Sequence, residues 1–179
     1  MHEVTIVNTS PLFYLHRLGL LQLLKELYGY ITVPEAVKKE LNEGRAQGED
    51  VPHLENYDWI EIRSVSMPTY LQLIVDLGPG ESEVLALAKN HPAALVILDD
   101  KLARRIAEMQ GFRLTGTAGV LLRAKQKGLV PELKPVIEKL LDLDFRLKPN
   151  LVKETLELAG EVGFLYTFFS TSPPLFCLF

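Results

Sequence analysis

The chain has 179 residues, 47% of them hydrophobic, which is enough to bury one sizeable core. Its formal net charge of −4 at pH 7 argues against a protein coated in basic charge for general nucleic-acid binding. The one cysteine, Cys177, excludes an intrachain disulfide and a thiol-based zinc site, so a metal here would have to bind oxygen or imidazole.

Short apolar runs and helical patterns alternate over the first 130 residues. The predicted strands span residues 4–7, 30–33, 59–63, 94–98 and 112–116. The predicted helices span residues 11–29, 34–44, 70–77, 81–90, 101–110 and 118–128. Strands that alternate with helices in this way indicate an α/β fold, with a central parallel sheet flanked by helices.

Boundary residues set where these helices should start and stop. Ser10 followed by Pro11 predicts a helix cap with proline at the first helical position. Gly19 would cost about 1 kcal/mol inside a helix, so we expect two helices or a kink there. Pro34 should open the next helix and Gly44 should end it.

The pattern changes to helices alone after residue 130, and we expect these additional C-terminal helices to pack on the α/β core. The last 17 residues carry no charge, but two prolines and a Ser/Thr cluster interrupt them too often for a membrane-spanning helix. We therefore divide the chain into an α/β domain (1–130), C-terminal helices (131–160) and an apolar tail (161–179).

This tail is expected to cover an edge of the core or a neighbouring subunit, and a role in assembly or membrane contact is an alternative. No basic segment precedes an apolar stretch at the N-terminus, so the sequence does not indicate a secretory signal. We expect a cytoplasmic protein without membrane contact.

Several polar side chains are expected to meet at the carboxyl ends of the strands, where open parallel sheets bind ligands. Asn8 ends the first predicted strand, Asp99 follows another, Glu81 opens a helix, and Glu40 projects from the helix after the second strand. Carboxylates held close together repel one another, and a hard cation such as Mg²⁺ or Mn²⁺ relieves that repulsion. Because such an ion can assist attack on a phosphate, a phosphodiester hydrolase is the leading class.

Each of these residues also has a simpler interpretation. Asp99 or Asp100 can cap the helix that follows. Glu81 and Glu83 lie in the first turn of their helix, where the helix dipole favours negative charge without any ligand. Glu40 can be solvated or paired with a neighbouring lysine. Their joint position at one edge of the sheet is the stronger argument.

Residues 101–127 carry seven basic side chains against one acidic side chain, Glu108. Basic residues on an amphipathic helix usually form a solvated face, so this surplus is typical of such a face as well as of a nucleic-acid contact.

Three blocks of the sequence resemble a known family. They are "IVNTSPLFYLHRLGLLQLLKELYGYITVPEAVKKEL", "LGPGESEVLALAKN" and "LVILDDKLARRIAEMQGFRLTGTAGVLLRAKQKGLV". In this order they resemble the successive blocks of PIN-domain proteins, and they are most similar to a small prokaryotic branch in which the helix after the fourth block reads GTxGxLLxAKxxG. The resemblance implies a Rossmann-like PIN fold and a Mg²⁺- or Mn²⁺-dependent ribonuclease acting on single-stranded RNA. Such proteins are often the toxin of a toxin–antitoxin pair, with an antitoxin protein as partner, and often homodimers.

The same resemblance implies which residues form the site. The metal set falls on Asn8, Glu40, Glu81 and Asp99, with Asp100 either sharing the last role or capping the helix. Of these, Glu40, Glu81 and Asp99 are the expected catalytic residues. Asn8 stands where most PIN domains have aspartate, and an amide oxygen can bind a metal but brings no negative charge and cannot act as a base.

The resemblance also implies that one of the paired aspartates belongs to the helix and the other to the metal. Asp99 is the expected ligand because it comes first after the strand. The side chains expected to contact RNA phosphates are Lys101, Arg104 and Arg105, with Thr115 or Thr117 as neutral hydrogen-bond donors. The alternative function is a degenerate PIN domain that binds RNA or a protein without hydrolysis.

Overall fold

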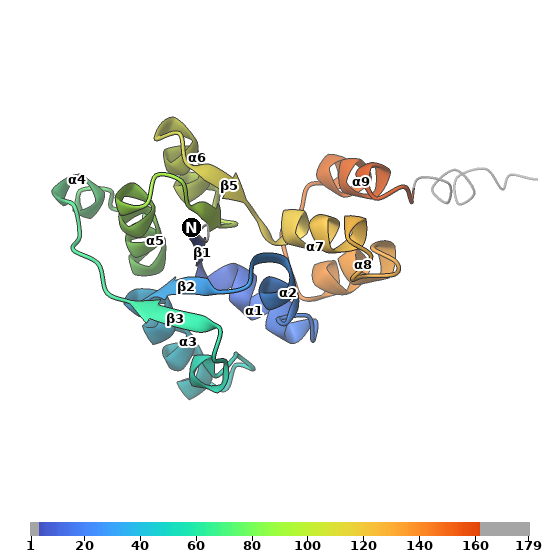
Figure 1. Ribbon diagram of the computed structural model, residues 1–179, viewed down its shortest axis with the longest axis horizontal. Helices are drawn as coiled ribbons and strands as arrows, with labels where there is room; N and C mark the ends of the chain where they lie inside the picture. Colours follow the sequence, from blue (N-terminus) through green and yellow to red (C-terminus); the bar gives the residue numbers. More distant parts are fainter. Residues whose placement is uncertain (1–3, 162–179) are drawn as a thin grey trace, which may run out of the picture.

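The computed structural model describes residues 4–161 and confirms the predicted α/β fold with a central parallel sheet (Figure 1). The five strands are β1 (Thr5–Val7), β2 (Ile31–Pro34), β3 (Ile60–Arg63), β4 (Leu95–Ile97) and β5 (Arg113–Thr115). They lie in the order β3-β2-β1-β4-β5, and every neighbouring pair is parallel. The chain therefore adds β2 and β3 on one side of β1 and then adds β4 and β5 on the other side.

The helices flank this sheet, with one short 3₁₀ turn at Leu54–Asn56. They are α1 (Thr9–Arg17), α2 (Leu23–Tyr28), α3 (Glu35–Ala46), α4 (Thr69–Gln72), α5 (Pro79–Asn90), α6 (Lys101–Met109), α7 (Thr117–Gln126), α8 (Lys134–Asp142) and α9 (Pro149–Leu158). Helix α5 packs on β1, β2 and β4 and against α3 and α6, whereas α1 and α2 both pack against α7. Among the helices of residues 4–161, none is both long enough and apolar enough to span a membrane.

Central strands are short and almost wholly buried. Ile6, Val96 and Ile97 have no exposed surface, which explains why these strands appear in the sequence as apolar runs without alternation. Residues of α8 and α9 join the same core, where Leu140 is fully buried and Leu156 is 3% exposed. Buried residues of the C-terminal helices therefore join the core of the α/β unit, while the predicted apolar tail lies almost entirely outside the described residues.

Helix α1 begins earlier than the sequence indicated, and this is a correction. Its first residue is Thr9 and its cap position is Asn8, so Ser10 lies inside the first turn. Pro11 is tolerated there because the first four N–H groups of a helix have no intrahelical partner. The predicted break at Gly19 is confirmed, since α1 ends at Arg17 and α2 starts at Leu23.

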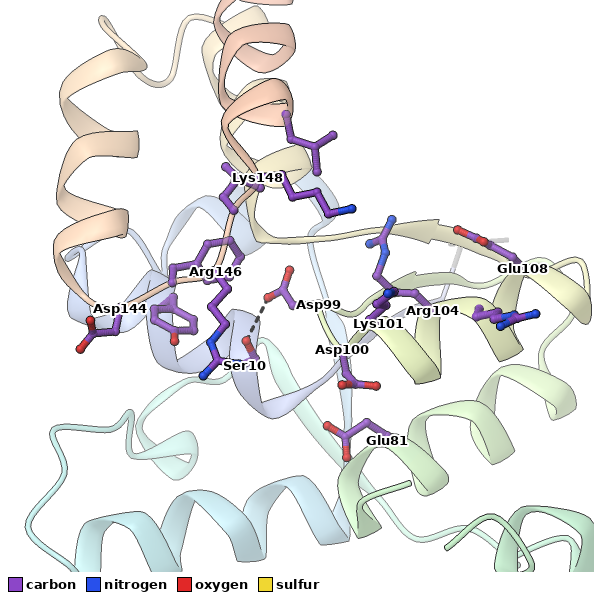
Figure 2. A pocket seen from close by; sticks show the side chains of 15 residues that line it. Ser10, Glu81, Asp99, Asp100, Lys101, Arg104, Glu108, Asp144, Arg146 and Lys148 are labelled. Atoms are coloured by element: carbon purple, nitrogen blue, oxygen red, sulfur yellow. Dashed lines mark hydrogen bonds between the residues drawn. The ribbon is translucent and has the colours of Figure 1, made fainter. Parts of the chain in front are cut away.

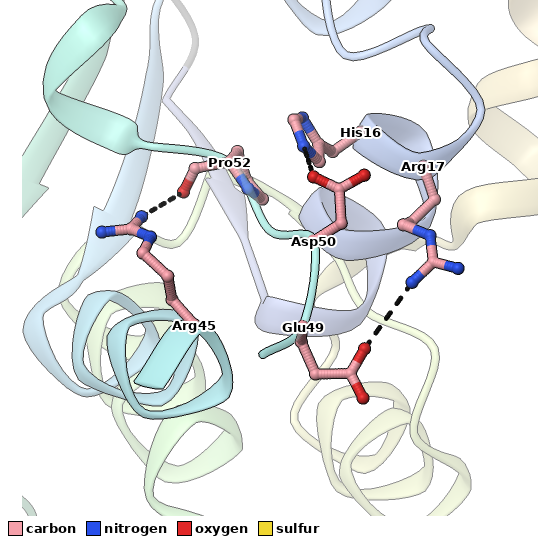
Figure 3. A network of polar contacts seen from close by, with 6 residues as sticks. All are labelled: His16, Arg17, Arg45, Glu49, Asp50 and Pro52. Atoms are coloured by element: carbon pink, nitrogen blue, oxygen red, sulfur yellow. Dashed lines mark hydrogen bonds and ion pairs between the residues drawn. The ribbon is translucent and has the colours of Figure 1, made fainter. Parts of the chain in front are cut away.

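Helix α3 was also wrongly bounded. Pro34 is the last residue of β2, where it pairs with Arg63, and Gly44 lies within the helix. The helix ends near Gly48, whose φ of 91° suits glycine. The segment after α3 is fastened to α1 and to α3 itself (Figure 3): His16 Nε2 lies 3.0 Å from Asp50 Oδ1, and Arg45 donates to the carbonyl of Pro52 at 3.0 Å.

Two further helices differ from the prediction. The expected helix over residues 70–77 is reduced to the four residues of α4, because Leu71 alone is buried there while Leu73 and Val75 are 75% and 94% exposed. A helix without an apolar face has little tertiary packing to stabilise it. Helix α5 starts at Pro79 and not at Glu81, with proline at a first-turn position.

Candidate active site

The strand order reverses between β1 and β4, and the residues that follow these two strands lie together. The register pairs Val7 with Ile97, and the backbone N–H of Asn8 donates to the carbonyl of Ile97 at 3.0 Å. Ligands of open α/β sheets bind beyond the carboxyl ends of the strands at such a reversal. Asn8 and Asp99 therefore lie where the topology makes a crevice.

A cleft of about 1300 Å³ opens at this edge (Figure 2). Its carboxylates are Glu81, Asp99, Asp100, Glu108 and Asp144. Its cations are Lys101, Arg104 and Arg105 from α6, and Arg146 and Lys148 from the linker between α8 and α9. In Figure 2 the Asp99 carboxylate lies between Arg146 on one side and Lys101 and Arg104 on the other.

Asp99 is held by donors from two other elements. Its Oδ1 accepts from the backbone N–H of Thr117 at 2.8 Å, and its Oδ2 accepts from the hydroxyls of Thr117 at 2.6 Å and Ser10 at 3.1 Å. Gly116 makes this approach possible, because a Cβ there would lie 2.7 Å from Asp99 Oδ1. The carboxylate is therefore fixed in orientation at the junction of β4, α1 and α7.

The neighbouring Asp100 caps the next helix, which is the other role expected for one member of this pair. It occupies the N-cap position of α6, and its Oδ1 accepts from the backbone N–H of Ala103 at 2.8 Å. Because the cap uses Asp100, the side chain of Asp99 is left for the site.

Glu81 and Asn8 form a pair. Asn8 is 1% exposed, and its Nδ2 donates to Glu81 Oε1 at 2.9 Å. Its Oδ1 is buried and has no hydrogen-bond partner within the described part of the chain. Buried polar atoms are normally satisfied, so this amide oxygen is an unmet acceptor beside a carboxylate.

The sequence left open whether Glu81 or Glu83 faces the cleft, and the structure distinguishes them. Glu81 lines the cleft, whereas Glu83 Oε2 accepts from the backbone N–H of Ala36 at 2.8 Å and so holds the start of α3.

Glu40 is placed differently from the other predicted acids. Its Oε1 accepts from the backbone N–H of Gly80 at 2.7 Å, and its Oε2 accepts a short hydrogen bond from the Thr9 hydroxyl. It is absent from the lining of the cleft. A Cβ on Gly80 would lie 2.6 Å from Glu40 Oε2, so this carboxylate packs directly on the first turn of α5.

The predicted metal ligands are therefore not assembled as a cage. Within residues 4–161, no three His, Cys, Asp or Glu side chains come close enough together to hold a metal ion. The physical reason is that like charges repel, and each carboxylate here accepts hydrogen bonds from neutral protein donors instead.

A smaller oxygen set is still present. Mg²⁺ is usually bound through only one or two carboxylates, with water and substrate phosphate completing its coordination. Glu81 and Asp99 line the same cleft. Asn8 does not line it, but its amide contacts Glu81, and its unmet Oδ1 is an oxygen ligand of the kind that a hard cation prefers. On this observation, the residues present fit a divalent ion.

Of the residues expected to contact RNA, the basic ones line the cleft and the two threonines do not. Lys101, Arg104 and Arg105 line the cleft, and one guanidinium nitrogen of Arg104 donates to the carbonyl of Leu98 at 2.9 Å. Thr115 lines a smaller adjoining cavity of about 300 Å³. Thr117 is fully buried with its hydroxyl on Asp99, so in this conformation it contacts the carboxylate and not solvent.

Sequence reasoning missed one side of the cleft, which Tyr14, Phe145, Arg146 and Lys148 form. Burial raises the pKa of the Tyr14 hydroxyl, and the carboxylates of Asp99 and Asp144 raise it further, while Arg146 opposes them. The signal available was the break in the helical pattern at "DLDFRLKPN", where an aromatic and two basic residues interrupt the apolar spacing.

Comparison with known proteins identifies the fold independently. A family model described as a PIN domain matches residues 4–161, which is most of the chain. The comparison with curated proteins gave no match.

Proposed function

This chain belongs to the PIN-domain family, whose nuclease-like fold generally cleaves RNA, and from that premise we propose that it is a metal-dependent endoribonuclease acting on single-stranded RNA. One observation carries the proposal: Glu81 and Asp99 share a cleft with five cations at the reversal point of the sheet. An acidic centre flanked by positive charge suits the cleavage of a phosphodiester chain.

The cations of the cleft support the binding of phosphate. In the part of the chain described here, no ion pair within 4.0 Å joins Lys101, Arg104, Arg105, Arg146 or Lys148 to a carboxylate. Several basic residues elsewhere are paired, as Lys38 is with Glu55 at 3.0 Å and Lys125 with Glu161 at 2.9 Å. The positive charge of the cleft therefore remains available to an anionic strand.

PIN domains generally use divalent metal ions, and we assign Asn8, Glu81 and Asp99 as the residues that would hold one here, with Mg²⁺ or Mn²⁺ as the ion. When bound, such an ion supplies positive charge to the scissile phosphate and makes water a better nucleophile. In this assignment Thr117 and Ser10 orient Asp99, and Glu40 supports the turn that presents Glu81.

The same resemblance leads us to propose a cellular role as the toxin of a toxin–antitoxin pair, acting as a cytoplasmic homodimer. Light scattering on the purified chain tests the dimer, and the expected result is twice the mass of 20.1 kDa.

The central experiment compares Glu81→Gln with Glu83→Gln, two charge-removing changes on the same helix. Glu81→Gln is expected to reduce Mn²⁺-dependent cleavage of a single-stranded RNA about 100-fold, because Glu81 is a proposed metal ligand. Glu83→Gln should cleave like the wild type, since its amide oxygen can still accept from Ala36 N–H. Cleavage that survives chelation of divalent ions, or that Glu81→Gln leaves intact, would contradict the proposal.

One observation favours the degenerate binding module as a second candidate. The Asn8 amide donates to Glu81 and so satisfies part of the carboxylate that a cation would use. Calorimetric titration of Mn²⁺ into the wild type and Asn8→Asp separates the two candidates. Binding to both proteins supports the nuclease, whereas binding and cleavage by Asn8→Asp alone support the degenerate module.

A further inference from the structure

The linker between α8 and α9, residues 144–148, forms one side of the cleft although it lies outside the strand-and-helix repeat that supplies the carboxylates. All five of its residues line the cleft, and three of them also line the adjoining cavity. Figure 2 shows this linker passing to one side of Asp99, with the side chains of Arg146 and Lys148 carried on it.

Hydrogen bonds and a ring contact hold the linker in place. The backbone N–H of Asp144 donates to the carbonyl of Leu141 at 3.0 Å, and Asp144 takes a φ of 62°, which turns the chain sharply after α8. Phe145 then meets Tyr14 of α1 edge to face, with ring centroids 4.8 Å apart and planes at 83°. The linker is thus fastened to the helix that carries Ser10, a hydrogen-bond partner of Asp99.

The chemistry of this side of the cleft is specific. Tyr14 and Phe145 are only half-buried and both line the cleft, while the neighbouring Arg146 and Lys148 are exposed. Proteins that bind single-stranded nucleic acid combine aromatic side chains, on which bases stack, with cations that follow the backbone. Asp144, the first residue of the linker, would repel a phosphate near it.

We propose that the Phe145 ring, held edge to face by Tyr14, forms a stacking surface for one unpaired base of an RNA strand, while Arg146 and Lys148 hold the adjoining phosphates. This inference rests on the proposed function, because the stacked nucleotide belongs to the strand that the cleft would cut. A base in a duplex already stacks on its neighbours, so the surface selects single-stranded RNA.

The test measures binding by fluorescence anisotropy in the presence of a chelator, so that no cleavage is involved. The probes are a labelled single-stranded RNA of eight uridines, the same strand with abasic riboses, and a duplex of equal length. The wild type is expected to bind the uridine strand about tenfold more tightly than either of the others.

Variants then locate the surface. Phe145→Ala should weaken binding of the uridine strand about tenfold and leave binding of the abasic strand unchanged, whereas Phe145→Tyr should restore binding. Phe145→Leu keeps apolar volume without a ring and should behave like Phe145→Ala, which covers the case in which the smaller residue disturbs folding. Tyr30→Ala removes an aromatic side chain that is 72% exposed and lies outside the cleft lining, so it should bind like the wild type.

Equal binding of the uridine and abasic strands, or full binding by both Phe145→Ala and Phe145→Leu, would overturn the inference. The readout separates it from the proposed function. Loss of binding in these variants, together with no cleavage by the wild type under any metal, would support the stacking surface and refute the nuclease. Mn²⁺-dependent cleavage with an unchanged KM in both variants would refute the stacking surface and support the nuclease.

Discussion

Thr117 has a structural role that its position in the sequence alone does not indicate. It is fully buried at the first position of α7, and both its N–H and its hydroxyl donate to Asp99. A hydrogen bond to a charged group contributes about 1.5–3 kcal/mol, more than a bond between neutral groups. Thr117 therefore couples the orientation of the candidate metal ligand to the stability of the fold.

Replacing Thr117 by valine, which has nearly the same shape, removes the hydroxyl alone. We expect Thr117→Val to lower the free energy of unfolding by about 1–2 kcal/mol, because Asp99 Oδ2 loses its shortest hydrogen bond. Urea unfolding measures this change. Thr117→Ser keeps the hydroxyl, so its free energy of unfolding should lie between those of the wild type and Thr117→Val. A Thr117→Val protein as stable as the wild type would mean that Asp99 does not depend on this donor.

The position of a site residue was predictable from the sequence where that residue directly follows a strand. Asn8 and Asp99 follow adjacent strands, so the topology alone predicts that they meet. The separation of Glu40 from the cleft was not predictable, because it depends on a short hydrogen bond to Thr9 and on the close approach of Gly80. Such contacts join residues far apart in the chain and leave no periodic signal.

At the level of whole elements, strands and helices were predicted better than their ends. The predicted stop at Gly44 was wrong because Gly44 keeps a helical backbone and α3 continues to Ala46, whereas Gly48 has the positive φ that ends the helix. The 144–148 linker was missed for a related reason. Its role depends on the contact between Phe145 and Tyr14 of α1, and periodicity in one segment does not report packing on another.

The end of α9 is fastened by Glu161. Its two carboxylate oxygens accept from the backbone N–H groups of Leu133 and Lys134, at 2.7 and 2.8 Å, and Lys125 Nζ lies 2.9 Å away. Burial raises the pKa of this carboxyl, but the three hydrogen bonds together outweigh burial and leave the pKa below its ordinary value of 4.5. A carboxyl whose pKa falls on folding stabilises the fold above its unfolded-state pKa and loses that effect as the pH falls.

Glu161→Gln is therefore expected to lower the melting temperature at pH 7, since an amide oxygen cannot replace both carboxylate oxygens. The difference from the wild type should shrink once the pH falls below about 4.5, where the wild-type carboxyl begins to take up a proton in the unfolded chain. Calorimetry between pH 7 and pH 3.5 measures this difference in melting temperature. Glu157→Gln, which removes only a surface pair with Lys153, is the matched control and should show little change. A difference that does not vary with pH would show that the charge of Glu161 is unimportant.

Considered as a whole molecule, the protein combines an overall negative charge with a cleft rich in unpaired cations. The net charge of −4 excludes a generally basic surface, but it does not exclude a local one. Of the seven basic residues in 101–127, only Lys101, Arg104 and Arg105 line the cleft, while Arg123 lies over the Tyr28 ring and Lys125 pairs with Glu161. The sequence predicted the surplus, and folding decided which part of it faces the cleft.

Salt dependence of RNA binding tests this division of charge. Each phosphate neutralised on a single strand contributes about −0.7 to the slope of log K against log salt. The double variant Lys101→Gln with Arg105→Gln should therefore flatten the slope by about 1.4. Lys127→Gln with Lys139→Gln removes the same charge from exposed positions outside the cleft lining and should leave the slope unchanged. Equal slopes for both double variants would mean that RNA does not follow the cleft.

The position of the 144–148 linker in the chain has a consequence for synthesis. Translation proceeds from the N-terminus, so Asn8, Glu81 and Asp99 emerge from the ribosome before the residues that lie opposite them. A nascent chain can thus form its sheet and its acidic centre while one side of the cleft is still missing. The linker begins about thirty residues after the end of β5, so the cleft can be completed only after the whole sheet has been synthesised.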